Sequence, residues 1–228
     1  MFASIARRYD LNNHLHSMGM DRRWRGVAVR MSQVPEGARV LDVACGTGDL
    51  SEAFARTPAA EVVGLDFTRE MLDVARARQA SLAPEFARKL RYVEGDAMAL
   101  PFDDASFDRA SIAFGLRNVS EPDKALSEFK RVLRPGGRLT VLEFDQPGSR
   151  IVRWLNDLYC ARIMPMTATL ISRDKSGAYY YLPRSVRTFM TSDALRDVLA
   201  RAGFADARTR RLSLGICACT IADNPRIT

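Results

Sequence analysis

The sequence predicts an α/β fold built on a mostly parallel sheet with helices on both faces. Apolar runs of strand length alternate with amphipathic stretches of helical length, and no internal repeat or low-complexity segment interrupts them. Because parallel neighbours must be joined by a crossover, this alternation favours right-handed β-α-β units. The expected strands are 38–43, 61–65, 90–93, 107–113 and 138–144, and the expected helices are 48–56, 69–80 and 122–132. A length of 228 residues suits a single domain, 1–228.

The two ends of the chain add helices and a final pair of strands. Residues 1–33 are mostly helical in pattern, with Gly19 as a break, and 150–172 form a long apolar stretch that Pro165 interrupts. Thr191 is a predicted N-cap for a helix that Gly203 closes. The last strands are 204–209 and 212–221, which brings the sheet to seven strands with helical additions at the N-terminus and after strand five.

Composition excludes little and favours an ordinary globular protein. The net charge is +7, but no block of like charges occurs, so a solvated basic surface is favoured over contact with anionic lipid, and nucleic acid is the least favoured partner. The four cysteines show no zinc-type spacing, and we expect no metal site. Without a signal peptide or an uncharged 18-residue stretch, we expect a cytoplasmic protein with no spanning helix.

A glycine-rich loop follows the first strand in the segment LDVACGTGDL. The strand is expected to end at Asp42, and a helix to begin near Asp49, so Gly46 and Gly48 lie where a ligand can approach free N–H groups. A dinucleotide fingerprint would need a third glycine where Ser51 stands, which makes a dehydrogenase the last choice. Asp42 would repel a pyrophosphate and would suit an ammonium or sulfonium group.

The next two strand ends carry further groups for such a ligand. Asp66 ends the second strand and can accept both hydroxyls of a ribose. After the third strand, Asp96 could accept from an adenine amino group while the N–H of Ala97 donates to the ring. An amino acid moiety, a ribose and an adenine together describe S-adenosylmethionine.

These motifs resemble the class I S-adenosylmethionine-dependent methyltransferases, whose Rossmann-like fold carries LPFDDASFD (100–108) before strand four and LRPGG (133–137) before strand five. Three further segments are similar to the menaquinone and ubiquinone C-methyltransferases. They are FASIARRYDLNNHLHSMGMDRRWR near the N-terminus, IAFGLRNVSEPDKAL at 112–126 and VLEFDQP at 141–147. The resemblance extends over about residues 2 to 220.

The resemblance implies ring C-methylation of a polyprenylated quinol, typically demethylmenaquinol to menaquinol. Alternatives are the benzoquinol precursor of ubiquinone, another phenolic or sterol acceptor, and a non-enzymatic cofactor-binding scaffold. The resemblance further implies that Thr47, Asp66, Asp96 and Ala97 contact the cofactor. The family often has Ser where this chain has Ala113, so a hydroxyl contact is lost there.

The reaction needs a base or positive charge near the phenol, and no metal. Arg117 and Asn118 follow the fourth strand, and we expect Arg117 to stabilise a phenolate and Asn118 to orient the quinol oxygen. The competing interpretation pairs Arg117 with a local carboxylate such as Glu121. The resemblance implies that Tyr9 and Asp10 belong to an N-terminal helical lid (1–33). His14 and His16 are more easily explained as structural residues than as a general base.

The polyprenyl tail of such a substrate would explain the helical addition after strand five. A polyprenyl chain must be collected from a membrane, so the apolar stretch from Ile151 to Ile171, within a substrate-side insertion at 150–190, could line a tail tunnel or rest on the bilayer. A core or dimer helix is the alternative. The expected partners are therefore a polyprenyl quinol, a peripheral membrane surface and a second copy of the chain.

Overall fold

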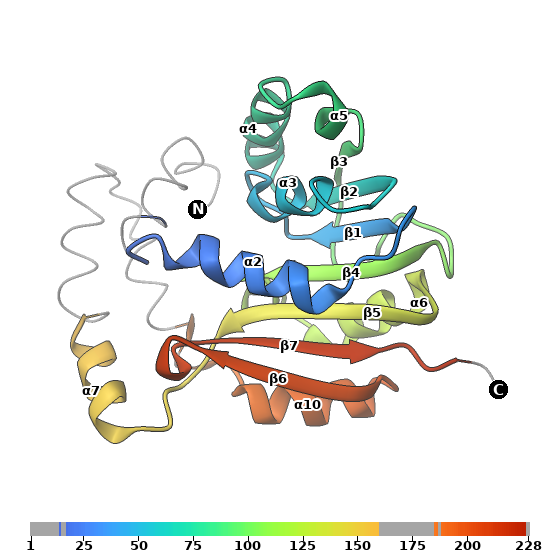
Figure 1. Cartoon of the computed structure of the whole chain (residues 1–228). Helices are drawn as coiled ribbons and strands as arrows, with labels where there is room; N and C mark the ends of the chain where they lie inside the picture. Colours follow the sequence, from blue (N-terminus) through green and yellow to red (C-terminus); the bar gives the residue numbers. More distant parts are fainter. Residues whose placement is uncertain (1–13, 15–16, 160–184, 187, 227–228) are drawn as a thin grey trace.

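A seven-stranded sheet forms the centre of the protein in a computed structural model that describes residues 14, 17–159, 185–186 and 188–226 (Figure 1). The strand order is β3-β2-β1-β4-β5-β7-β6. The first five strands are parallel, and β7 runs antiparallel between β5 and β6. The strands are β1 (Arg39–Val43), β2 (Glu61–Asp66), β3 (Leu90–Glu94), β4 (Phe107–Ala113), β5 (Leu133–Phe144), β6 (Ala205–Leu212) and β7 (Cys217–Asp223). The predicted mostly parallel, seven-stranded architecture is confirmed.

Helices cover both faces of this sheet, as the alternating pattern predicts. Figure 1 shows α2 on the near side of the sheet and α6 on the far side. The described helices are α2 (Met20–Ser32), α3 (Asp49–Ala55), α4 (Arg69–Gln79), α5 (Pro84–Ala87), α6 (Pro122–Val132), α7 (Arg150–Leu158) and α10 (Ser192–Arg201), with short 3-10 turns η1 (Leu116–Asn118) and η3 (Ser213–Gly215). Three expected boundary signals hold: Gly19 precedes α2 at φ +72°, the Thr191 hydroxyl accepts from the N–H of Ala194, and Gly203 follows the end of α10 at φ +83°.

Side chains alternate between the two faces of the sheet along each strand, so the core has one layer on each face. Leu41 and Val43 of β1 pack with Phe129 of α6, whereas Val40 packs on the other face with Phe54 of α3. All of these side chains are fully buried. Since burying a large apolar side chain contributes about 1.5–3 kcal/mol, the two layers fix both the sheet and the helices that carry the site.

One predicted turn lies inside a strand. We expected LRPGG to separate a helix from strand five, but β5 already begins at Leu133, directly after α6. Phe107 pairs with Leu133, and the next pair in this ladder joins Arg109 to Arg138. The segment is therefore a bulge in β5, with Gly136 at φ +80°.

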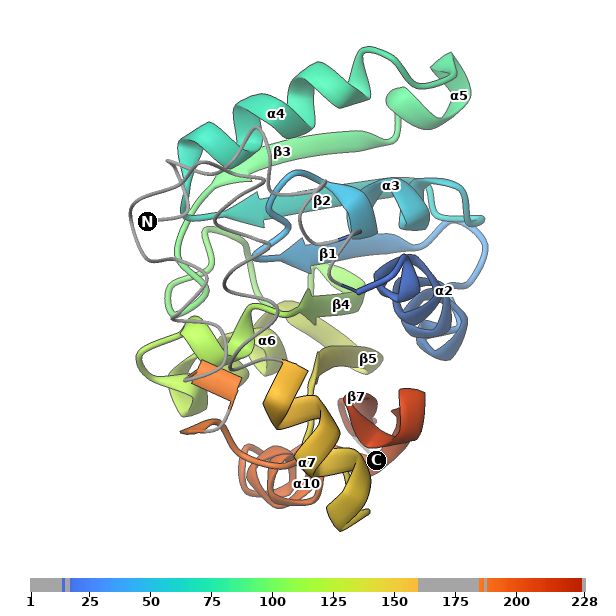
Figure 2. The ribbon, with the colours of Figure 1, turned by 90° about the vertical axis from the view of Figure 1, so that its left-hand side faces the viewer.

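Part of the expected additions lies outside the described residues. This concerns Tyr9, Asp10 and His16, and the stretch 160–184 with Pro165. Of the addition after strand five, the structure describes α7 and residues 185–186 and 188–190, and α7 lies at the end of the sheet towards which the parallel strands run (Figure 1 and Figure 2). No helix in the described residues is long and apolar enough to cross a membrane.

Candidate active site

The loop after β1 has an unusual backbone. Ala44, Gly46 and Gly48 all have positive φ, at +53°, +56° and +91°. The N–H of Cys45 donates to Leu65 O at 3.0 Å, which fixes the loop against the end of β2. Gly48 is the N-cap of α3, so the free N–H groups of this helix begin at the loop.

The two glycines of the loop are required for different reasons. A Cβ on Gly48 would lie 2.5 Å from the hydroxyl oxygen of Tyr92, so the packing beneath the loop requires the missing side chain. A Cβ on Gly46 would meet no atom within 4 Å, because it would enter open space in front of the loop. That space is the cavity described next.

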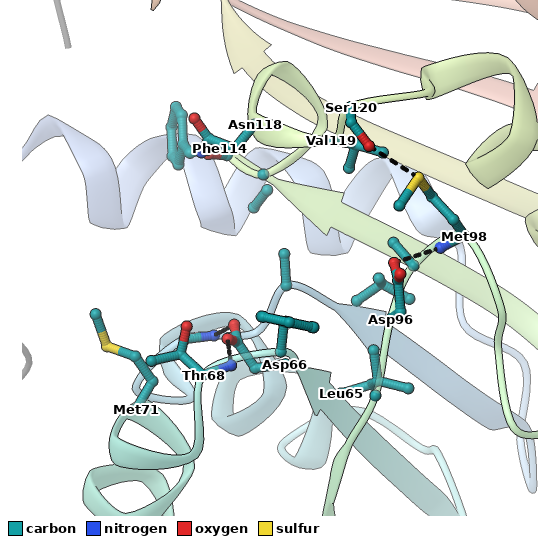
Figure 3. A pocket seen from close by; sticks show the side chains of 18 residues that line it. Leu65, Asp66, Thr68, Met71, Asp96, Met98, Phe114, Asn118, Val119 and Ser120 are labelled. Atoms are coloured by element: carbon teal, nitrogen blue, oxygen red, sulfur yellow. Dashed lines mark hydrogen bonds between the residues drawn. The ribbon is translucent and has the colours of Figure 1, made fainter. Parts of the chain in front are cut away.

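A mostly apolar cavity of about 380 Å³ lies at the carboxyl ends of the parallel strands (Figure 3). This is within the size range of small-molecule sites, and it lies beside β1 and β4, where the strand order reverses. Its walls come from the segments that follow β1, β2, β3 and β4. The lining residues are Val43, Ala44, Gly46, Leu65, Asp66, Phe67, Thr68, Met71, Gly95, Asp96, Ala97, Met98, Ala113, Phe114, Gly115, Asn118, Val119 and Ser120.

Asp66 lies at the centre of one wall. Its carboxylate accepts the N–H of Gly46 at 2.8 Å and the N–H of Thr68 at 2.8 Å, one on each oxygen. Burial raises the pKa of Asp66, while these two backbone donors partly oppose the rise. Each oxygen keeps a second lone pair, so the carboxylate can hold the two loops together and still accept hydroxyl donors from a ligand.

Asp96 and Ala97 line the cavity farther from the glycine loop. The Asp96 carboxylate accepts the N–H of Met98 at 2.8 Å, which orders the segment after β3. The neighbouring wall is apolar, with Leu65, Met98 and Val119. Two carboxylates separated by an apolar surface suit a ligand that combines hydroxyl groups with a flat, weakly polar ring.

Asp42 lies behind the loop and does not line the cavity. It is 1% exposed, and its carboxylate accepts Ser51 Oγ at 2.6 Å and Ser111 Oγ at 2.7 Å. Burial raises its pKa to about 6. The structure therefore changes the interpretation of Asp42 from a cofactor contact to an anchor that joins β4 to the first turn of α3. Thr47, which is buried, and Gly48 are likewise absent from the lining.

Arg117 and Asn118 are adjacent in η1 but differ in position. Asn118 lines the cavity, whereas Arg117 is directed to β5, where its Nη1 lies 2.8 Å from a Glu143 oxygen. The guanidinium also stacks over Phe144, with 5.4 Å between its Cζ and the ring centroid. Arg117 is thus paired with a carboxylate, as the competing interpretation expected, but the partner is Glu143 and not Glu121.

Sequence reasoning found the charged lining residues and missed the apolar ones. Phe67, Met71, Met98 and Phe114 form much of the wall, and their types are as common in cores as in ligand sites. For Phe67 and Phe114 the available signal was a position directly after β2 and β4, whereas Met71 and Met98 lie several residues beyond β2 and β3. Ala113 does line the cavity, so its methyl group stands where a serine would offer a hydroxyl.

A group of ionisable side chains lies beside the glycine loop. His14 Nδ1 is 2.5 Å from Asp21, and Arg25 lies 2.6 Å from Asp21 and 3.6 Å from Asp49, the first residue of α3. His14, Asp21 and Asp49 approach closely enough to suggest a metal site. However, the Arg25 guanidinium already supplies positive charge to both carboxylates, so this group is better explained as an ionic link between α2 and α3.

Comparisons with known proteins agree with this geometry. The ubiE/COQ5 methyltransferase family matches residues 1–223. The chain is 45% identical to the demethylmenaquinone methyltransferase of Thermus thermophilus (99% of this chain, 100% of the relative) and 42% identical to the ubiquinone/menaquinone biosynthesis C-methyltransferase UbiE of Hahella chejuensis (96% and 87%). A crystal structure of a SAM-dependent methyltransferase from Thermotoga maritima shares the fold, with a TM-score of 0.67, 20% identity and coverage of 98% and 97%. The chain therefore belongs to the ubiE/COQ5 methyltransferase family, and S-adenosylmethionine is its methyl donor.

Proposed function

We propose that the protein transfers the methyl group of S-adenosylmethionine to a ring carbon of a polyprenylated quinol, with demethylmenaquinol as the substrate. The observation that carries this proposal is the cavity, in which Asp66 and Asp96 face the turn that holds Asn118. The near full-length similarity to a demethylmenaquinone methyltransferase selects the quinol among methyl acceptors.

The lining residues fit S-adenosylmethionine. Asp66 would accept the ribose hydroxyls, and Asp96 with the Ala97 N–H would hold the adenine edge beside Met98. Gly46 leaves room for the amino acid end, and Asp42 supports this end from behind the loop through Ser51. S-adenosylmethionine supplies an activated methyl group on a positively charged sulfur.

The quinol hydroxyl must lose its proton before the ring carbon becomes a good nucleophile. A phenol titrates near ~10, so the ring carbon is a weak nucleophile at neutral pH. We assign Asn118 to the quinol oxygen because it lines the cavity. Arg117 is assigned to electrostatic stabilisation of the phenolate from a position behind the cavity wall. Its Nε is buried without a hydrogen-bond partner in the described residues. Tyr9 and Asp10 keep their assignment to a lid over the cofactor.

Methyl transfer is tested with purified protein, labelled S-adenosylmethionine and a short-tailed demethylmenaquinol kept reduced. A product heavier by one methyl on a ring carbon is expected. A parallel reaction with the benzoquinol precursor tests the alternative that the UbiE name suggests. Tight cofactor binding without transfer to either quinol would refute the proposed substrate class and leave the methyltransferase assignment intact.

The proposed tail substrate also requires contact with a membrane, and α7 is suited to it. Ile151, Trp154 and Leu155 are 72%, 63% and 52% exposed, although they are large and apolar. Arg150 and Arg153 accompany them on the same helix. Apolar side chains with neighbouring arginines are typical of helices that lie in the surface of an anionic bilayer. We therefore propose that α7 rests on the membrane that holds the quinol.

Sedimentation with vesicles of anionic phospholipid tests this contact. We expect Leu155→Asp to lose binding while its melting temperature is kept, because the side chain is largely exposed. Ala80→Asp places the same charge at an exposed residue after α4 and serves as the control. Unchanged vesicle binding of Leu155→Asp, together with loss of a concentration-dependent dimer, would assign the face to a second copy of the chain instead.

A further inference from the structure

We infer that Glu143 is a positioning residue for methyl transfer, because it holds the turn that presents Asn118 to the cavity. The inference rests on the proposed function for the role of that turn. Glu143 lies at the penultimate position of β5 and is 4% exposed. It does not line the cavity, so its effect on the reaction must pass through other residues.

Glu143 binds Arg117 at two points. One carboxylate oxygen is 2.8 Å from Arg117 Nη1, and the other accepts the backbone N–H of Arg117 at 3.4 Å. The first oxygen also accepts the N–H of Phe144 at 2.9 Å, which fixes the carboxylate to its own strand. A single side chain therefore ties both the backbone and the guanidinium of η1 to the carboxyl end of β5.

The turn needs this support because its backbone is strained. Phe114 has φ +56°, a conformation that costs a residue other than glycine about 1–2 kcal/mol. Its N–H is held by Leu142 O at 2.8 Å, and its carbonyl accepts from both Arg117 Nη1 and Asn118 Nδ2. The side chain that Glu143 anchors thus shares an acceptor with the side chain that faces the quinol.

Because the Arg117–Glu143 pair is buried, losing one partner costs much more stability than the intact pair contributes. The side chains of Arg117 and Glu143 are 6% and 5% exposed, so removing the carboxylate leaves a guanidinium charge without its ionic partner in a dry site. That charge must then move towards water or another acceptor. Because Arg117 and Asn118 are consecutive in η1, such a movement displaces Asn118 from the cavity wall.

Steady-state kinetics of Glu143→Gln test the inference. We expect kcat to fall at least tenfold, while the dissociation constant of S-adenosylmethionine stays within threefold, because Asp66 and Asp96 are on other segments. Glu121→Gln is the matched control: it removes the same charge from an exposed residue three positions after Asn118 and should leave kcat unchanged. Should Glu143→Gln fail to fold, Glu143→Asp keeps the charge with a shorter reach and should show an intermediate kcat.

A second readout does not depend on methyl transfer. The Trp24 ring packs 6.2 Å from both Phe114 and Phe144, measured between centroids, and therefore senses the turn. In a Trp154→Phe background, Glu143→Gln should change the Trp24 emission and Glu121→Gln should not. Unchanged emission and kcat in a folded Glu143→Gln protein would overturn the inference, as would equal losses of kcat and cofactor affinity. If the wild type methylates no quinol, the proposed function is refuted. The Trp24 emission then still tests whether Glu143 holds the turn.

Discussion

Replacing Gly48 by alanine should destabilise the protein more than its small size suggests. Gly48 has φ +91°, and an added Cβ would lie 2.5 Å from the Tyr92 hydroxyl oxygen, 3.2 Å from its Cζ and 3.3 Å from the Cβ of Ala75. Both neighbours are buried, in the layer between the sheet and α3 and α4. The new methyl group therefore meets an unfavourable backbone conformation and a filled space together.

The expected cost follows from these two contributions. A left-handed conformation costs an alanine about 1–2 kcal/mol, and overpacking a filled core site costs about 1–3 kcal/mol. Their sum predicts a loss of about 2–5 kcal/mol of unfolding free energy, a large part of the stability of an ordinary domain. Gly37→Ala separates the two contributions, because Gly37 also has a positive φ of +71° but no atom within 4 Å of the added Cβ.

Urea unfolding measures these differences, provided that the denaturant slope stays constant. Tyr92→Phe completes a double-mutant cycle, since the Tyr92 hydroxyl is buried without a hydrogen-bond partner in the described residues. Alone it should stabilise the protein by about 1 kcal/mol, because no hydrogen bond is lost and a desolvated hydroxyl is removed. In the Gly48→Ala background it should recover more than that, because the closest contact disappears.

Two results would contradict this reasoning. If Gly48→Ala costs no more than Gly37→Ala, the contact with Tyr92 has no energetic weight. If the effects of Gly48→Ala and Tyr92→Phe are additive, the two groups do not touch in solution.

Three further outcomes are expected at the site. Burial raises the pKa of Asp42 from 3.8 to about 6, so the folded protein binds this proton more tightly and loses stability as pH rises through that range. Asp42→Asn should remove this loss, about 2 kcal/mol between pH 4 and pH 6, in urea unfolding as a function of pH. Asp66→Ala should weaken S-adenosylmethionine binding about tenfold or more by calorimetry, because it frees the Gly46 and Thr68 amides. Phe67→Ala should also weaken binding yet leave the melting temperature unchanged, since this cavity-lining side chain is 77% exposed.

The order of strands and helices was predictable because each layer of the core repeats a simple period. Every expected strand and helix between residues 38 and 144 appears, with ends shifted by a few residues, and the largest shift is at LRPGG. There the glycines and proline permit either a turn or a bulge. The pairing of Phe107 with Leu133 selects the bulge, and such a long-range contact leaves no local signal.

The chemistry of the cavity was predictable where a polar residue directly follows a strand. Asp96 and Ala97 come after β3, Asp66 is the last residue of β2, and all three line the cavity. The apolar wall could not be assigned in advance, because Met71 and Phe114 have the composition of a core. Only the arrangement of four strand ends around one space distinguishes them from it.

Asp42 and Arg117 show why residues at the correct edge can still face away from the ligand. The expected strand 38–43 is confirmed as β1, and Asp42 and Val43 are its last two residues. Since strand side chains alternate, Val43 lines the cavity, whereas Asp42 points to the opposite face, towards Ser51 of α3. In η1, consecutive residues also diverge, so Asn118 lines the cavity and Arg117 reaches Glu143. The direction of the side chain changes from one residue to the next, whereas sequence patterns locate the end of a strand or helix only to within a few residues. A second layer of charged residues therefore lies behind the cavity, and its contribution to the reaction is best measured through the residues that it positions.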